Sequence, residues 1–115
     1  MKHRNKKIIL DRLSNKRGLL LRNLAFSLFD LGRIKTTEAK AKALKPWCEK
    51  LMTRAKNDSL HNRRELLKYF PQKLVTKMLK ELAPKYRGKN GGYIRLIKLG
   101  RRKGDGASMA IIELV

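Results

Sequence analysis

The C-terminal segment YIRLIKLGRRKGDGASMAIIELV, residues 93–115, decides the fold class of this chain. Its first part, Tyr93 to Leu99, is rich in β-forming residues and has apolar residues at both odd and even positions, as in a mostly buried strand. Its last part, Met109 to Val115, alternates with the strand period of two and puts on one face Ala110, Ile112 and Leu114. Turn residues join the two parts, so the segment predicts a C-terminal β-hairpin.

Upstream of the hairpin, apolar residues recur at the helical spacing of three and four. Ser14 suits the N-cap of a first helix and Gly32 suits its left-handed C-terminal cap. Gly18 lies inside this helix and indicates either a close approach of another backbone or simple tolerance. The expected inward stripe is Leu20, Leu24, Leu28 and Leu31, flanked by Leu21 and Ala25.

The next residues predict a short strand, Arg33 to Thr36, because RIKTT is rich in β-branched side chains. Thr37 then caps a second helix, which Pro46 is expected to kink or to displace at its start. The residues expected to face inward from this helix are Ala43, Leu44, Trp47, Leu51 and Ala55.

Two further helices are expected before the hairpin. Asp58 offers the cap of the third, which carries Leu60, Arg63, Arg64, Leu67 and Phe70. Pro71 suits the first turn of the fourth, which has Leu74, Met78 and Leu82 on one face and ends at Ala83 and Pro84. These elements predict an α+β fold with about four helices packed on a small mixed sheet. We expect a single domain over residues 1–115 with a basic N-terminal arm, residues 1–8.

The charge of the chain points to a polyanionic partner. Thirty Lys and Arg residues stand against nine Asp and Glu, which leaves a formal net charge of +21 over 115 residues. A chain of this charge repels itself and is attracted to polyanions. Nucleic acid is the first expectation and an acidic membrane surface is the second.

Several classes of protein are disfavoured. No apolar run approaches the roughly 20 residues that span a bilayer, and the start MKHRNKKIIL has neither the apolar core nor the cleavage site of a secretion signal. The single Cys48 excludes an internal disulfide, fits a reducing cytoplasm and suits an apolar filling role on a helix.

The chain also lacks the residues of a catalytic or cofactor site. His3 and His61 are the only histidines and the nine acids are scattered, so we expect no enzyme, no metal and no cofactor. A phosphate-binding P-loop requires its lysine after the last glycine, at a strand-to-helix turn. Here Lys89 precedes Gly91 and Gly92, and a strand follows.

A contact surface for RNA explains the same glycines and lysines. From Lys85 to Gly104 there are eight Lys or Arg and no acid, and glycines let the main chain approach a phosphate or a sugar closely. Tyr86 and Tyr93 are either stacking platforms for unpaired bases or core residues. Two further basic groups are the arm and the first helix, which we expect to form one polyanion-facing side with this loop: Lys2, His3, Arg4, Lys6 and Lys7, then Arg12, Lys16, Arg17 and Arg22.

Three stretches, RGLLLRNLAFSL, RIKTTEAKAKALK and NGGYIRLIKLGRRKGDGASMAIIEL, resemble the bacterial large-ribosomal-subunit protein 17 family. The likeness covers essentially the whole chain in order. Departures from the family are Lys16 in place of a usual His, Asp11 in place of a common Gly, Ser108 in place of a usual Pro, and the unusual Pro46.

The resemblance implies a non-enzymatic, cytoplasmic component of the large ribosomal subunit that braces ribosomal RNA beside neighbouring proteins near the peptide exit side. It adds Asn23, Lys35, Thr36 and the loop Arg87–Tyr93 as RNA-facing positions. With Arg95 and the hairpin turn, the candidate contacts in the second half of the chain are Arg87, Lys89, Asn90, Gly91, Gly92, Tyr93, Arg95, Arg101, Arg102 and Lys103. The alternatives are a nucleoid-type DNA-binding protein, which predicts a recognition helix or a dimer interface, and a cationic membrane-surface protein.

Overall fold

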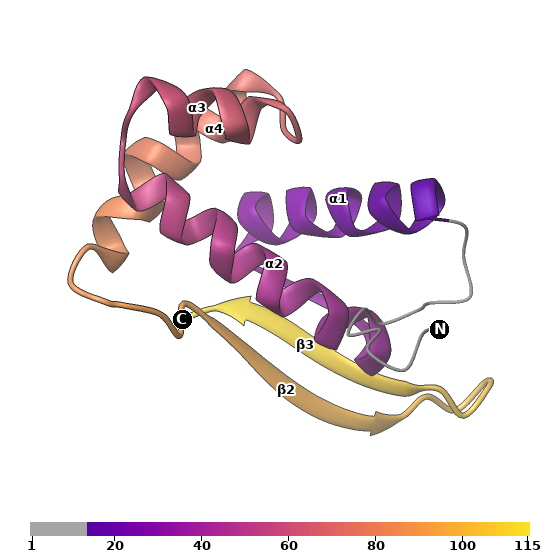
Figure 1. Ribbon diagram of the computed structural model, residues 1–115. Coiled ribbons are helices and arrows are strands. Elements are labelled where there is room, and N and C mark those ends of the chain that lie inside the picture. Colours follow the sequence, from indigo (N-terminus) through magenta and orange to yellow (C-terminus); the bar gives the residue numbers. More distant parts are fainter. Residues whose placement is uncertain (1–13) are drawn as a thin grey trace, which may run out of the picture.

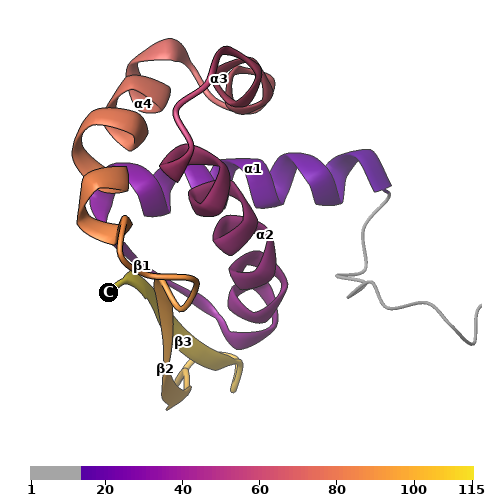
Figure 2. The same ribbon diagram turned by 60° about the vertical axis from the view of Figure 1, so that its left-hand side comes forward.

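The chain folds around its second helix, α2 (Glu38–Lys56), which contacts α1, α3 and all three strands. The structure is a computed structural model that describes residues 14–115. Figure 1 shows the sheet on one side of α2 and the later helices on the other, and Figure 2 shows the same order from a second direction. The apolar face of the sheet is thereby buried against a helix, as the hairpin pattern requires.

The sheet has three strands in the order β1-β3-β2, with β1 at Arg33–Thr37, β2 at Ile94–Arg101 and β3 at Ser108–Leu114. The predicted hairpin is confirmed by the antiparallel pairing of β2 with β3, with Leu96 opposite Ile112. The early strand also pairs antiparallel with β3, with Thr36 opposite Ala110, so the expectation of a mixed sheet was wrong. Because β1 and β2 both pair antiparallel with β3, the three strands contain no parallel pair.

Helix α1 (Ser14–Leu31) buries a stripe that differs slightly from the predicted one. Ala25, Leu28 and Phe29 are fully buried, whereas Leu31 is 69% exposed. The buried residues Ala25, Leu28 and Phe29 follow the helical spacing i, i+3, i+4, so the next position of the stripe, i+7, is Gly32 and Leu31 lies outside it. The predicted cap is confirmed, because Gly32 has φ 88° and its N–H donates to the Leu28 carbonyl at 2.8 Å.

Gly18 inside α1 and Gly32 just after its end give predictions of opposite sign. Gly32→Ala is expected to lower the free energy of unfolding by about 1 kcal/mol, because an L residue is strained at positive φ. Gly18→Ala is expected to raise it by up to about 1 kcal/mol, because a Cβ there meets nothing within 4 Å and alanine favours the helix. Urea unfolding of both variants measures the two shifts. Equal signs would show that the backbone of one of these glycines is not as described.

Helix α2 begins at its predicted cap, since the Thr37 hydroxyl accepts a hydrogen bond from the Lys40 N–H at 3.4 Å. The helix runs past Pro46, so the expected displacement of its start does not occur. Pro46 and Lys42 are both exposed, and the turn that lacks its hydrogen bond therefore faces solvent. Cys48 is buried inside this helix, and the burial raises the pKa of its thiol.

Helix α3 (Leu60–Leu67) is capped by Ser59 rather than by the predicted Asp58. The Ser59 hydroxyl accepts from the Asn62 N–H at 3.2 Å, while the Asp58 carboxylate accepts from Arg63 at 2.6 and 2.9 Å. The Asp58 side chain, which was predicted to cap the helix, therefore forms an ion pair with Arg63 instead. The helix buries Leu66 and leaves Leu60 and Leu67 exposed.

The last helical segment is longer than predicted. Helix α4 (Gln72–Lys77) has Pro71 at its N-cap and continues as a π-helical turn, η1 (Met78–Leu82), and a 3-10 turn, η2 (Ala83–Tyr86). Pro84 does not end the segment, because a proline is tolerated in the first turn of the new 3-10 helix, where its missing N–H is not needed. The predicted inward face is confirmed by the burial of Leu74, Met78 and Leu82.

Candidate nucleic-acid interface

The glycine-rich loop between η2 and β2, residues 87–92, is held in place by a carboxylate from α2. Glu49 accepts hydrogen bonds from two consecutive backbone amides, Tyr93 N–H to Oε2 at 3.2 Å and Ile94 N–H to Oε1 at 3.0 Å. These two contacts fix the point at which the loop becomes a strand.

Lys56, the last residue of α2, holds the other side of the loop. Its Nζ donates to the Lys89 carbonyl and to the Tyr93 hydroxyl, the latter at 2.8 Å, and it lies 4.9 Å from the centre of the Tyr93 ring. The hydrogen bond from Lys56 lowers the pKa of the Tyr93 hydroxyl. The contacts of Glu49 and Lys56 therefore fix the backbone conformation of the loop, in which Gly92 adopts φ 67°.

Tyr86 and Tyr93 are core residues. They are 4% and 1% exposed, and their ring centres lie 5.4 Å apart in an edge-to-face contact. The Tyr86 hydroxyl donates to the Val115 carbonyl at 2.8 Å, which ties η2 to the end of β3. The hypothesis that these two rings stack on unpaired bases was therefore wrong, because their faces are covered by protein.

The remaining candidate residues of the loop are on the surface. Arg87, Lys89 and Asn90 are exposed, but the Lys89 Nζ folds back to donate to the Gly92 carbonyl at 3.0 Å. Lys89 must give up or share that bond to contact a phosphate. Arg87 and the main chain of Gly91 and Gly92 need no such change, because Gly92 is exposed and neither glycine carries a side chain.

The outer face of the sheet brings together basic residues that are far apart in the sequence. Arg33 on β1 and Arg95 on β2 flank Glu113 on β3, with Arg95 at 2.6 Å and Arg33 at 3.7 Å from its carboxylate. Lys35 is exposed in the next row, opposite Ile111. Thr36 points to the other face and is 8% exposed, so its predicted side-chain contact with RNA was wrong.

The hairpin turn carries three exposed cations, Arg101, Arg102 and Lys103. Arg102 forms a two-pronged ion pair with Asp105, at 3.0 and 2.6 Å, and this pair lowers the pKa of the Asp105 carboxyl. The same carboxylate accepts from the Ala107 N–H at 3.1 Å. Arg102 thus helps to shape the turn, whereas Arg101 and Lys103 carry no such ion pair with a carboxylate of residues 14–115.

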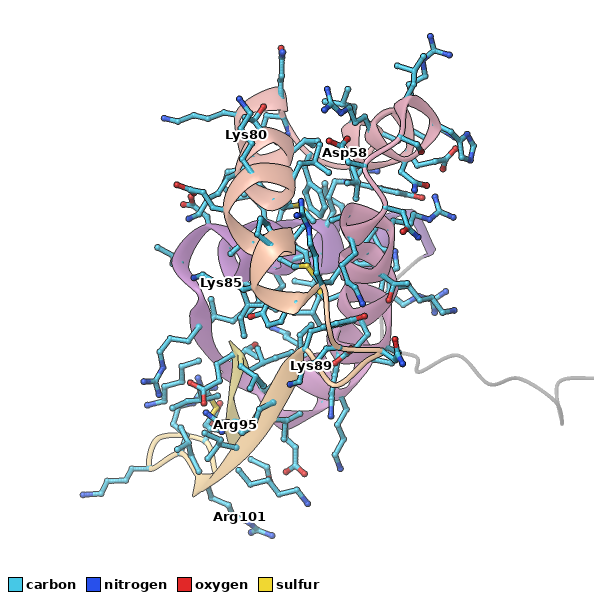
Figure 3. The ribbon with its side chains drawn as sticks, turned by 90° about the vertical axis from the view of Figure 1, so that its left-hand side faces the viewer. Asp58, Lys80, Lys85, Lys89, Arg95 and Arg101 are labelled. Atoms are coloured by element: carbon cyan, nitrogen blue, oxygen red, sulfur yellow. The ribbon has the colours of Figure 1, made fainter. Side chains whose placement is uncertain are left out.

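One side of the molecule gathers a column of cations from four elements. Figure 3 shows Lys80 of η1, Lys85 of η2, Lys89 of the loop, Arg95 of β2 and Arg101 at the end of β2 in order along this side. We call these five residues the basic face. Asp58 lies at the upper end of the same view and is neutralised by Arg63 at 2.6 Å. Lys80 and Lys85 were not among the predicted contact residues, although Lys85 begins the basic stretch, because only the path of η1 and η2 aligns them with β2.

The candidate residues of α1 lie elsewhere. Lys16, Arg22 and Asn23 are exposed and Arg17 is partly buried. Figure 1 places the N-terminal end of α1 and the loop before β2 at opposite ends of the molecule. The structure therefore separates these two groups of cations along the molecule, and the expectation that they form one polyanion-facing side stays a prediction. The candidate residues Lys2, His3, Arg4, Lys6, Lys7 and Arg12 lie outside the described residues.

The acids of residues 14–115 act mainly as local partners of cations. Glu38 accepts from Lys42 and Lys98, and Glu65 accepts from Arg54 and Lys68. These contacts lower the pKa of each carboxyl. In this part of the chain no group of three or more His, Cys, Asp or Glu is placed to hold a metal ion, and no helix is long and apolar enough to cross a membrane.

Comparison with known proteins identifies the family of the chain. The sequence profile of the family described as "Ribosomal protein L17" matches residues 20–115. Two proteins named "Large ribosomal subunit protein bL17", from Carboxydothermus hydrogenoformans and Moorella thermoacetica, are each 50% identical over 107 residues, which are 92% of this chain and 96% of the relative. The protein of that name from Alkaliphilus metalliredigens is 51% identical over 107 residues, 92% of this chain and 95% of its own. Because both the profile and the relatives match most of the chain, it belongs to the ribosomal protein L17 family.

Proposed function

We propose that this chain is a structural component of the large ribosomal subunit in the bacterial cytoplasm, where it binds and braces ribosomal RNA without catalysing a reaction. The observation that carries the proposal is the basic face, in which five cations from η1, η2, the loop and β2 line one side of a folded α+β scaffold. A rigid array of cations matches the regularly spaced phosphates of a folded RNA.

Different parts of the chain make different contacts with the RNA in this proposal. The basic face meets the phosphate backbone, while Glu49 and Lys56 keep the loop in a shape that presents the amides and glycines of residues 87–92. Backbone amides in such a turn attract anions. The N-terminal arm supplies a second group of cations, which we expect to follow the RNA away from the domain. We expect neighbouring large-subunit proteins near the peptide exit side to contact the domain away from the basic face.

The test is assembly into the subunit. Purified full-length chain is added to large subunits that lack it, in moderate salt, and is expected to co-sediment with them. A parallel titration compares large-subunit RNA with duplex DNA at the same salt. Failure to co-sediment, or tighter binding to duplex DNA, would overturn the proposal and favour a nucleoid-type DNA-binding protein.

Salt dependence gives a quantitative prediction. If about eight cations contact phosphates, the logarithm of the affinity for large-subunit RNA falls with the logarithm of salt concentration with a slope of roughly −6 to −7. Removal of residues 2–7, which hold five Lys, Arg or His, is expected to make that slope shallower by several units while thermal unfolding of the free protein stays nearly unchanged. Filter binding over a salt series and a thermal melt measure the two effects. A large loss of thermal stability would instead show that the arm packs against the domain.

A further inference from the structure

An open groove between α1 and α2 combines aromatic side chains with a cationic rim. It has a volume of about 940 Å³, which falls within the 300–1,000 Å³ usual for ligand sites. Its floor is mostly apolar, with Leu19, Leu21, Ala43, Pro46, Trp47 and Tyr69. Its charged lining residues are Lys16, Arg22 and Lys50, and no carboxylate of residues 14–115 lines it.

The aromatic residues of the groove are held in fixed positions. Trp47 and Tyr69 meet edge to face, with ring centres 5.3 Å apart and planes at 88°, and Trp47 also lies 6.3 Å from the buried Phe70. The Arg22 guanidinium lies 5.7 Å from the centre of the Tyr69 ring. Protein packing thus holds both rings in place, and both line the groove.

Trp47 is unlike its neighbours on α2. Leu44, Cys48 and Leu51 are at most 3% exposed, whereas Trp47 and Tyr69 are only partly buried. The sequence indicated an inward, structural role for Trp47. Its indole borders both the core and the groove, so it is placed to meet a ligand without leaving its packing.

We infer that this groove binds an unpaired base of the ribosomal RNA, with the base against Trp47 and Tyr69 and the adjoining phosphates against Arg22 and Lys50. The inference rests on the proposed function and specifies a second contact, separate from the basic face. Single-stranded RNA is recognised by aromatic rings and arginine planes that stack on bases, beside cations that neutralise the backbone. An apolar protein segment in the same groove would cover Arg22 and Lys50 without neutralising their charges, which is costly.

Trp47 is the only tryptophan of the chain, so its fluorescence reports on this groove alone. The full-length chain is titrated at one salt concentration with an unstructured RNA oligonucleotide and with inorganic polyphosphate of equal charge. We expect the oligonucleotide to quench the Trp47 emission strongly and polyphosphate to leave it nearly unchanged, because only the oligonucleotide has bases to stack. Equal quenching by both, or RNA binding without quenching, would overturn the inference while leaving the proposed function intact.

Substitutions of Trp47 distinguish base stacking from the attraction between cations and phosphates. Trp47→Leu is expected to weaken oligonucleotide binding about tenfold, as the loss of one stacked base predicts, and to leave polyphosphate binding unchanged. Trp47→Phe is expected to restore most of the loss. Phe26→Leu is the matched control, because Phe26 is 39% exposed on α1 and lies outside the groove. An equal loss in the control would contradict the inference.

The assembled subunit gives a readout that does not depend on variant folding. Ultraviolet irradiation of large subunits that contain the wild-type chain is expected to crosslink Trp47 or Tyr69 to RNA. Crosslinks from these residues to a neighbouring protein would overturn the inference and identify the groove as a protein contact. Failure of the free chain to bind either polyanion at moderate salt would count against the proposed function itself.

Discussion

Glu49→Ala is expected to lower the free energy of unfolding by about 2–4 kcal/mol, because it removes the acceptor of two backbone amides beside the core. A hydrogen bond to a charged group contributes about 1.5–3 kcal/mol, and a buried amide left without a partner carries its own penalty. The two amides belong to Tyr93 and Ile94, which are 1% and 3% exposed. Urea unfolding followed by circular dichroism, at moderate salt, measures the change.

Glu65→Ala is the matched control for this prediction. Glu65 also has two partners, Arg54 at 3.0 Å and Lys68 at 3.0 Å, but both contacts are exposed ion pairs. Such pairs contribute about 0–1 kcal/mol. Both substitutions remove one negative charge, so the general effect of net charge is the same in each. Equal losses of stability would show that Glu49 acts only through charge and does not anchor the loop.

Replacing Lys85 and Arg101 together with glutamine is expected to weaken binding to large-subunit RNA roughly 10- to 100-fold at moderate salt. Both residues belong to the basic face and both are exposed. Each phosphate contact that is lost removes a charge-assisted hydrogen bond of about 1 kcal/mol or more. The slope of log affinity against log salt is expected to become shallower by about 1.5–2. Filter binding over a salt series measures both quantities.

Arg64→Gln with Lys73→Gln removes the same charge from a different region. Arg64 on α3 and Lys73 on α4 are exposed, and these helices lie on the far side of α2 from the sheet. We expect the control to retain most of the affinity and most of the salt slope. If the two double variants weaken RNA binding equally, the basic face has no special role and net charge alone drives association.

The parts of the fold that depend on neighbouring residues could be read from the sequence. Thr37 and Gly32 cap helices because their effect involves atoms three or four residues away. The alternation in β3 predicted which residues it would bury, and Ala110 and Ile112 are fully buried. The net charge predicted a polyanionic partner, and the scattered histidines and acids argued against a catalytic or metal site.

The parts that depend on distant residues were missed. Glu49 and Lys56 contact Tyr93 from 44 and 37 positions away in the sequence, so no local sequence pattern predicts either contact. Tyr86 and Tyr93 stand between basic residues in the sequence, which suggested stacking on bases. Their rings are nevertheless buried against each other, because η2 returns the chain to the core before β2 begins.

The sequence by itself determined the type of each main element, the hairpin and the attraction to a polyanion, since these follow from periodicity, short-range hydrogen bonds and total charge. Only the tertiary structure decided which side chains form a surface. It placed β1 on the far edge of β3, gathered the basic face from four elements, and paired Trp47 with Tyr69 beside a cationic groove. The physical reason is that a surface is made by residues adjacent in space, and packing across α2 sets that adjacency.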